Sequence, residues 1–351
     1  MSDWTPDAIQ ARHIPYADLR PCLNAFVDAR TPGSDRKENF TIIGPGVSEN
    51  PDQHVHLPEP HGFNIGGARQ PAGCLNSQHS HETAEVFIVH SGRWRFMWGP
   101  NADDGEVILE KGDVISLPIH MFRGFENITE NEAEPSFLFA VLGGDDPGKV
   151  TWTPSVFDLA KDYGLVLLKG GRLVDTTQGE TVPEGATRET PPDADTIRRL
   201  ASPSDADMLK GVVRAADMAG NPDSPLAADG VEEAPIITPS STRDGFRSGP
   251  ITGWWPHHFN LRRLTIRPGS ATLMHAREEE EVILMQSGQL TLTWRHGDHT
   301  HTLTLGPGDV FSTPKGLVHA FSATGDEPAM AYIVRGGDAP AMPITETKAA
   351  A

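Results

Sequence analysis

Hydrophobic and polar residues alternate in many short runs along the chain, the pattern of strands with one buried face. Residues 93–98 are the clearest case, because aromatic or other apolar side chains occupy every second position. Further short apolar runs that end at glycine, proline or aspartate turns lie at residues 40–43, 107–109, 114–117 and 137–142. The pattern predicts an all-β chain of short strands.

Helical periodicity is confined to three short stretches. We expect a helix after Thr153 and Pro154 that stops at Gly164, and a helix capped by Ser204 that carries apolar residues as far as Ala216. The pattern of residues 18–28 predicts a third short helix, which Pro21 interrupts early. The long stretch 151–250 between the strand-rich regions is polar and proline-rich, so we interpret it as a connector with short helices.

The chain repeats itself at a spacing of 196 residues. Matched pairs include His61 and His257, Phe63 and Phe259, Gly73 and Gly269, His79 and His275, Glu85 and Glu281, Trp98 and Trp294, and Asp113 and Asp309. No gap is needed until the spacing falls to 193, which predicts a three-residue difference near residues 128–133. A match of this length indicates a duplicated domain.

Composition narrows the function classes. The chain of 351 residues has 35 glycines and 30 prolines, which favours turns, and its formal net charge of −19 would repel nucleic acid and anionic membranes. Cys22 and Cys74 form no CxxC pair, so no disulfide framework is expected. The polar start MSDWTPDAIQ lacks the apolar core of a secretory signal, and we expect a cytoplasmic protein.

Two histidines and a glutamate form the strongest candidate site. His79 and His81 project to the same side of a strand because side chains alternate, and a turn can return Glu85 beside them. Two imidazoles and a carboxylate are the facial triad of a first-row divalent metal. A surface hairpin that carries the same residues by coincidence is the alternative.

The spacing of Gly73, His79, His81, Glu85 and Gly92 resembles the first motif of the cupin superfamily. The second motif begins at Gly112, Asp113 and Pro118, then departs from the family pattern, with His120 at a usual glycine and Arg123 at the fourth ligand position. The resemblance implies two cupin barrels (double-stranded β-helix, jelly-roll) in tandem. The expected domains are an arm (1–60) that packs on the first barrel (61–150), the connector (151–250), the second barrel (251–340) and a flexible tail (341–351).

The second copy keeps His275, Glu281 and His319 but carries Arg277 in a histidine place. Arginine cannot ligate a metal but pairs with carboxylates. Each arginine therefore either clamps an anionic substrate beside a metal or fills the metal's place by pairing with the glutamate, and one barrel could be active while its twin is vestigial. We favour the first barrel as active, with Arg123 and His120 as catalytic residues, Arg123 and Arg277 as substrate-binding residues, and the second triad as the less favoured metal site.

Bicupins that resemble this chain include gentisate and salicylate dioxygenases, quercetinase-like dioxygenases and oxalate decarboxylases. The resemblance implies a metal-dependent bicupin, and our first hypothesis is an Fe(II)-dependent dioxygenase acting on a small aromatic or other carboxylated compound. Mn, Ni or Zn are the alternative metals. The other hypotheses are a non-redox isomerase or lyase, and a metal-free ligand-binding or structural bicupin. We expect an anionic small-molecule substrate and a homo-oligomer.

Overall fold

The structure is a computed structural model that describes residues 4–131, 133–238, 248–251, 255–337 and 341–345. Strands dominate, and the contacts between residues divide the chain into two compact units. One unit comprises residues 20–215, and the other joins the described residues of 1–19 to those of 216–351. Each unit contains one copy of the repeat that the sequence predicts.

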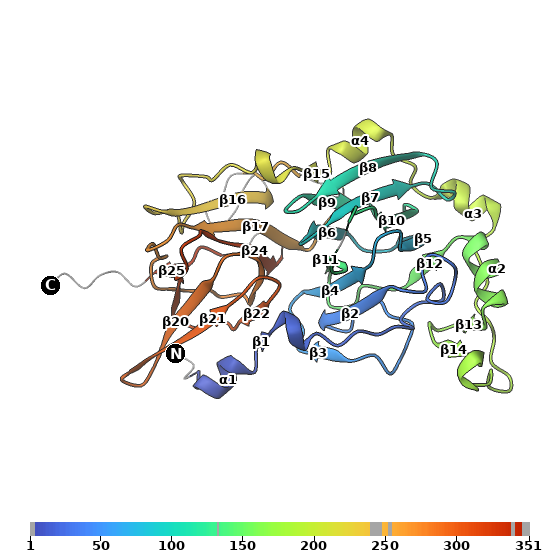
Figure 1. The fold of residues 1–351 in the computed structure, drawn as a ribbon, viewed down its shortest axis with the longest axis horizontal. Coiled ribbons are helices and arrows are strands. Elements are labelled where there is room, and N and C mark those ends of the chain that lie inside the picture. The colour runs from blue at the N-terminus through green and yellow to red at the C-terminus, as the bar shows by residue number, and fades with distance from the viewer. Residues whose placement is uncertain (1–3, 132, 239–247, 252–254, 338–340, 346–351) are drawn as a thin grey trace. The chain divides into compact units, whose positions relative to one another are not determined.

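The unit of residues 20–215 holds a jelly-roll of two sheets (Figure 1), with strand orders β15-β9-β6-β11-β4-β2-β3 and β12-β5-β10-β7-β8. Apolar side chains from both sheets form one buried cluster. The strands are β2 (Glu38–Ile43), β3 (Val55–Leu57), β4 (Phe63–Gln70), β5 (Leu75–His81), β6 (Glu85–Val89), β7 (Arg93–Trp98), β8 (Gly105–Glu110), β9 (Val114–Leu117), β10 (Arg123–Asn127), β11 (Ser136–Gly143), β12 (Val150–Trp152) and β15 (Val212–Val213).

The other unit has the same two-sheet plan, with orders β1-β22-β19-β24-β17-β16 and β21-β20-β23-β18-β25. Its strands are β1 (His13–Ile14), β16 (Val231–Ile237), β17 (Phe259–Ile266), β18 (His275–Ala276), β19 (Glu281–Ser287), β20 (Leu290–His296), β21 (His299–Leu305), β22 (Val310–Thr313), β23 (His319–Ala323), β24 (Ala329–Gly336) and β25 (Ile344–Thr345). Its core cluster again draws on both sheets.

The register of the strands follows the sequence repeat. In the first barrel Phe63 of β4 pairs with Gly143 of β11, and in the second Phe259 of β17 pairs with Gly336 of β24. The first members of these pairs are 196 residues apart and the second members 193, as the sequence predicts. The prediction of an all-β chain of two tandem barrels is confirmed.

The connector carries structure of its own. It contains α2 (Pro154–Asp162), the hairpin β13 (Leu165–Leu167) and β14 (Leu173–Asp175), the short 3-10 helix η2 (Thr176–Gln178), α3 (Ala194–Arg199) and α4 (Asp205–Leu209). Helix α2 and the hairpin bury a small apolar cluster with Val27, Ala29 and Trp152. This cluster attaches the first part of the connector to the first barrel.

Two predicted helices differ from the structure. Residues 19–28 form loops and turns, because Pro21 disfavours a helical Arg20 and Cys22 instead bridges to Asn39. The helix capped by Ser204 ends at Leu209, since Val212 and Val213 pair with β9 as strand β15. In both places tertiary pairing overrides local periodicity.

Two short arms, residues 5–18 and 204–217, have the same structure, 199 residues apart. In the first, α1 (Pro6–Gln10) leads into β1, which pairs with β22 of the second barrel, and into the 3-10 helix η1 (Tyr16–Asp18). In the second, α4 leads into β15, which pairs with β9 of the first barrel, and into η3 (Ala215–Asp217). The arm before each barrel thus belongs to the other barrel.

Equivalent aspartates hold the two arms. Asp113 accepts hydrogen bonds from Arg214 Nη1 and Ala215 N, each at 2.8 Å. Asp309 contacts His13 Nε2 and accepts from Tyr16 N, each at 2.9 Å. We expected all residues up to Pro60 to pack on the first barrel, but those up to Leu19 belong to the unit of the second.

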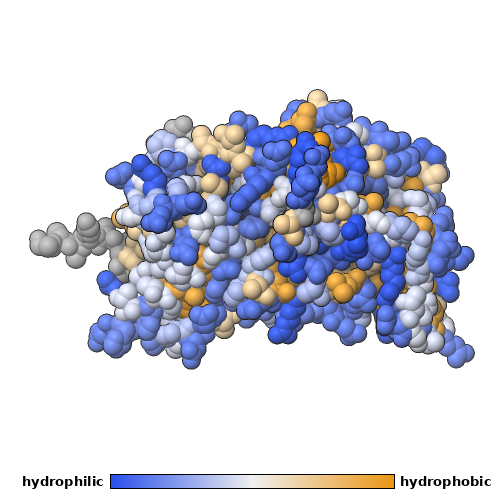
Figure 2. All heavy atoms as spheres, viewed as in Figure 1, coloured by the Kyte–Doolittle hydropathy of each residue, from blue (hydrophilic) through white to orange (hydrophobic). Residues whose placement is uncertain are grey.

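At the other end of the chain, Ile344 and Thr345 form β25, which pairs with β18. Of the predicted flexible tail, residues 341–345 are described and residues 346–351 lie outside the described residues. Figure 2 shows a face covered mostly by hydrophilic residues, with apolar residues in separate patches. Within the described part of the chain, no helix combines the length and apolar character needed to cross a membrane.

Candidate metal centre

His79, His81 and Glu85 converge inside the first barrel. The two histidines lie at alternate positions near the end of β5, and Glu85 begins β6 after a short turn. All three side chains are buried, and one donor atom from each lies within 4.8 Å of the other two. The convergence expected from strand alternation is therefore observed, while the assignment of these residues as metal ligands stays a prediction.

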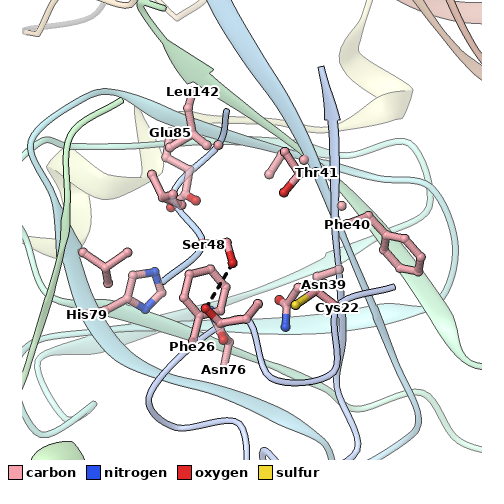
Figure 3. Close-up of a pocket in the computed structure, with 18 of the residues that line it drawn as sticks. Cys22, Phe26, Asn39, Phe40, Thr41, Ser48, Asn76, His79, Glu85 and Leu142 are labelled. Carbon is pink, nitrogen blue, oxygen red and sulfur yellow. Dashed lines mark hydrogen bonds between the residues drawn. The ribbon is translucent and has the colours of Figure 1, made fainter. Parts of the chain in front are cut away.

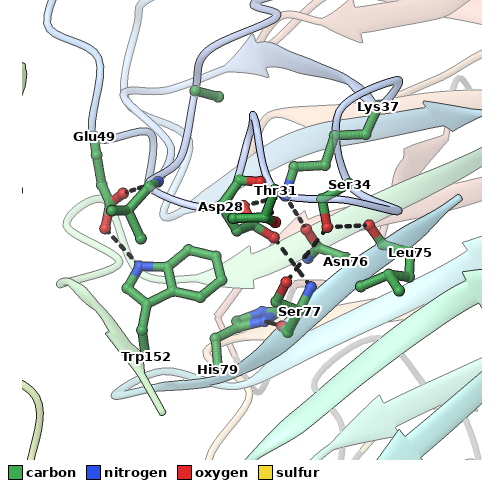
Figure 4. A network of polar contacts seen from close by, with 12 residues as sticks. Asp28, Thr31, Ser34, Lys37, Glu49, Leu75, Asn76, Ser77, His79 and Trp152 are labelled. Carbon is green, nitrogen blue, oxygen red and sulfur yellow. Dashed lines mark hydrogen bonds and ion pairs between the residues drawn. The ribbon is translucent and has the colours of Figure 1, made fainter. Parts of the chain in front are cut away.

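Backbone contacts orient the His79 ring. Its Nδ1 lies 2.7 Å from the carbonyl oxygen of Ser77, which leaves Nε2 as the atom available to a ligand. The amide of Ser77 donates in turn to Asp28 Oδ2 at 3.1 Å. Figure 4 shows this chain of contacts from the loop that carries Asp28 to the histidine.

Asp28 belongs to a fully buried polar network beneath the triad. Lys37 Nζ donates to Asp28 Oδ1 and, at 2.7 Å, to Asn76 Oδ1. Burial raises the pKa of Asp28, but the Lys37 ammonium and the hydrogen bonds outweigh it and hold the pKa below its usual value. The network therefore supplies a fixed anion that anchors the backbone beside His79.

Glu85 is paired with Arg123. The guanidinium donates from Nε at 3.2 Å and Nη2 at 2.9 Å to Glu85 Oε2, and from Nη1 at 3.1 Å to the Met121 carbonyl. Burial raises the pKa of Glu85, and Arg123 opposes that rise. Glu85 Oε1 lies 3.6 Å from His81 Nε2, so this oxygen faces the triad while the other faces the arginine.

Burial also keeps both imidazoles neutral. It lowers the pKa of His79 to about 3 and that of His81 well below its usual value, and the Arg123 charge acts in the same direction. A neutral imidazole offers a lone pair to a metal, whereas a protonated one does not. The donor set of two neutral nitrogens and one carboxylate oxygen thus fits a divalent ion of the iron, manganese or nickel type.

Arg123 and His120, the other two predicted functional residues of this barrel, do not line the cavity beside the triad. Arg123 is fully buried and is not among the described residues that line the adjacent cavity. His120 is exposed, in a turn with φ of 57°, where the second copy has Gly316 with φ of 73°. The geometry favours a positioning role for Arg123 over direct substrate contact.

A cavity of about 70 Å³ adjoins the triad. Figure 3 shows His79 and Glu85 on one side of it and Cys22, Asn39 and Thr41 on the other. Aromatic walls come from Phe26 and Trp152 among others, and amides and hydroxyls provide the polar lining. Among the described residues that line the cavity, none is lysine or arginine.

The second barrel brings His275, Glu281 and His319 within the same 4.8 Å. Arg277 Nε and Arg335 Nε lie 3.6 and 3.7 Å from Glu281 Oε2, beyond hydrogen-bond distance. Burial raises the pKa of Glu281 to about 7, against the opposing charge of Arg277. Within the described part of the chain, both histidine Nε2 atoms and both Glu281 oxygens lack a hydrogen-bond partner.

The interiors of the two barrels differ at equivalent positions. Gly66, Leu142 and Asn39 line the first-barrel cavity, and the matching residues of the second barrel are Arg262, Arg335 and Glu233. All three are buried. Large charged side chains therefore occupy positions that small or neutral ones hold beside the first triad, which favours the first barrel as the ligand-binding one.

Two residues near the first-barrel triad, Trp152 and Glu49, could not be identified as part of the site from the sequence. Trp152, on β12, packs its ring 5.2 Å from the His79 ring, and its Nε1 donates to Glu49 Oε1 at 2.7 Å. Burial raises the pKa of Glu49 to about 8, against the hydrogen bonds from Trp152 and Val27. Both residues lie outside the two motifs, so only the fold brings them to the triad.

Comparisons with known proteins agree with this architecture. Residues 262–335 match the family model of the cupin domain. No curated protein matches the chain significantly. The family match covers the second barrel, and the register shared by the two barrels extends the same fold to the first.

Solved structures match both barrels together. A point mutant of oxalate decarboxylase from Bacillus subtilis aligns with a TM-score of 0.57 at 13% identity, over 95% of this chain and 79% of that one. A formate complex of oxalate decarboxylase from Lactobacillus farciminis aligns with a TM-score of 0.55 at 13% identity, over 95% and 88%. At this identity the likeness shows the fold alone, two tandem cupin barrels.

Proposed function

We propose that the first barrel is a divalent-metal centre that cleaves a carbon–carbon bond of a small carboxylate, releasing carbon dioxide without net oxidation. The observation that carries the proposal is the buried triad of His79, His81 and Glu85 at the wall of a cavity of about 70 Å³. In balanced form, R–COO⁻ and one proton give R–H and CO₂. A bound metal would supply a Lewis acid for the carboxylate.

Charge supports an anionic substrate. Arg123 neutralises Glu85 and the two imidazoles are neutral, so a divalent ion at the triad would keep its full charge in a buried site. An uncompensated buried charge is unfavourable, and an anionic ligand would remove the imbalance. This replaces our earlier expectation that an arginine holds the substrate carboxylate directly.

Cavity size supports a small substrate. An apolar cavity that accepts benzene has a volume of about 150 Å³, twice that of the cavity beside His79. The smaller space favours an acid of two or three carbons over an aromatic acid. The names of the two matching structures, both oxalate decarboxylases, support the same choice of a lyase over the Fe(II)-dependent ring-cleaving dioxygenase.

The test is to purify the protein without chelators, measure its metal by mass spectrometry and incubate it with oxalate or malonate. We expect about one first-row metal ion at the first-barrel triad and release of carbon dioxide without net oxygen consumption. Stoichiometric oxygen uptake, with these acids or with gentisate after addition of ferrous iron, would instead establish a dioxygenase. Protein that neither contains nor takes up metal would favour the metal-free alternative, a ligand-binding or structural bicupin.

A further inference from the structure

Two cavities of the first-barrel unit share one wall. The inner cavity, of about 70 Å³, contains the triad, and an outer cavity of about 360 Å³ is lined by connector residues such as Phe157 and Leu167. The residues that line both are Gly46, Val47, Ser48, Val150 and Trp152. Trp152 has by far the largest side chain of the five, so it forms most of the partition.

Trp152 is fixed in place from several sides. Its exposed fraction is 1%, and the Nε1–Glu49 hydrogen bond sets the direction of the ring. Phe26 contacts the ring edge-on at 5.8 Å, and Lys37 Nζ lies 5.9 Å from its centroid. Figure 4 shows the indole between Glu49 and His79. These contacts hold the indole in one orientation, so Trp152 acts as a fixed wall and not as a movable lid.

Among the described residues of the second barrel, the position equivalent to Trp152 carries no aromatic side chain. Trp152 of β12 pairs with His79, and in the equivalent place Thr345 of β25 pairs with His275. Thr345 is small and exposed. The partition therefore belongs to the first barrel, whose cavity is lined by Gly66 where the second barrel has Arg262. This links Trp152 to ligand binding in the first barrel rather than to the barrel fold.

We propose that Trp152 is the specificity-determining residue that limits the ligand of the first barrel to a few carbon atoms. The inference rests on the proposed function, in that the ligand's carboxylate lies at the triad. Its other end then meets the indole face, and a longer chain would have to pass through the space of the ring to reach the outer cavity.

The lining of the outer cavity decides which longer ligands would fit there. Glu82 and Glu189 outnumber Lys149, so a second carboxylate would be repelled. Val47, Phe157 and Leu167 offer apolar surface to an alkyl chain. Removal of the indole should therefore admit straight-chain monocarboxylates rather than long dicarboxylates.

The experiment measures binding of acetate, butyrate and hexanoate to Mn²⁺-loaded protein by calorimetry, with metal occupancy checked by electron paramagnetic resonance. Wild-type protein should bind hexanoate at least tenfold more weakly than acetate, and Trp152→Ala should bring the two affinities within about twofold. An unchanged ratio in a folded, metal-loaded Trp152→Ala variant overturns the inference.

Two further variants protect the result against misfolding. Trp152→Phe keeps most of the packing and should shift the ratio in the same direction by less, so it decides the question if Trp152→Ala does not fold. Trp94→Phe is the matched control, because Trp94 is equally buried and its Nε1 donates to Ser91 O at 2.9 Å, yet it lines neither cavity. Its ratio should equal the wild-type one.

Failure of the proposed function would appear separately, as wild-type protein that retains no Mn²⁺. The inference is then decided by a crystal structure of Trp152→Ala, in which the inner and outer cavities must join into one. Closure of the gap by residues 46–48 would overturn it.

Discussion

Arg123 holds Glu85 by a single oxygen. Both hydrogen bonds of the guanidinium go to Oε2, and Oε1 faces His81 Nε2 at 3.6 Å. Carboxylates that ligate metals are commonly hydrogen-bonded through their other oxygen, which fixes their direction. The pairing is thus compatible with a metal at the triad, and it favours Arg123 as support for the ligand over Arg123 in the metal's place.

Arg123→Lys should weaken Mn²⁺ binding by about 10-fold or more, because lysine keeps the charge but cannot direct two bonds at one oxygen. Titration calorimetry measures the affinity directly. Arg277→Lys, the matched change in the second barrel, should leave the first-barrel affinity unchanged. If Arg123→His gains stoichiometric metal where the parent has none, arginine occupies the metal's place and the supporting role is rejected.

His81→Ala should abolish both the first-barrel metal and turnover, since it removes one of three donor atoms. His275→Ala should leave turnover intact, because Arg335 lies 3.7 Å from Glu281 in the second barrel, where the first barrel has Leu142 lining its cavity. Metal content and initial rates of carbon dioxide release distinguish the two variants. Loss of turnover in His275→Ala alone would move the active site to the second barrel.

Lys37→Met should destabilise the fold by about 3–5 kcal/mol, because it leaves the Asp28 carboxylate buried and unpaired. The double variant Lys37→Met with Asp28→Leu should recover part of that loss, though not the bond from Ser77 N. Urea unfolding gives both free energies. Equal stability of the single and double variants would show that the buried pair is not what stabilises this loop.

The raised pKa of Glu49 predicts that the folded protein loses stability as the pH becomes alkaline. Burial raises its folded pKa from 4.5 to about 8, so its contribution is complete below pH 4.5 and declines as pH rises to about 8. The full difference corresponds to roughly 5 kcal/mol at most. Glu49→Gln should flatten this decline when urea midpoints at pH 5.5 and pH 8.5 are compared. A decline equally steep in both proteins would refute the assignment.

The sequence predicted the parts of the fold that depend on local and repeated patterns. The alternation in β7, the turn glycines and the 196-residue spacing are all readable without long-range contacts, and the triad follows from one strand and one turn. The helix predicted after Ser204 ended early because the pairing of Val212 with Ile115 is invisible in the local pattern.

The surroundings of the triad could not be predicted. Asp28, Lys37 and Glu49 lie in loops and Trp152 lies on strand β12, with no fixed spacing between them in the sequence. Nothing in the sequence marks a lysine as fully buried before its partner is known. The similarity of the two arms is visible in the sequence, because the helix-capping residues Thr5 and Ser204 lie 199 residues apart.

Each half of the chain supplies an arm to the barrel of the other half. A single proteolytic cut in the connector near Gly185 would give fragments of which each retains the arm that completes the other's barrel: residues 5–18 seated on β22, and residues 204–217 seated on β9. Such a nicked protein should stay associated under native conditions and separate only when a barrel edge unfolds. The same arrangement would arise if two one-barrel chains had traded arms as a symmetric pair before a fusion joined them.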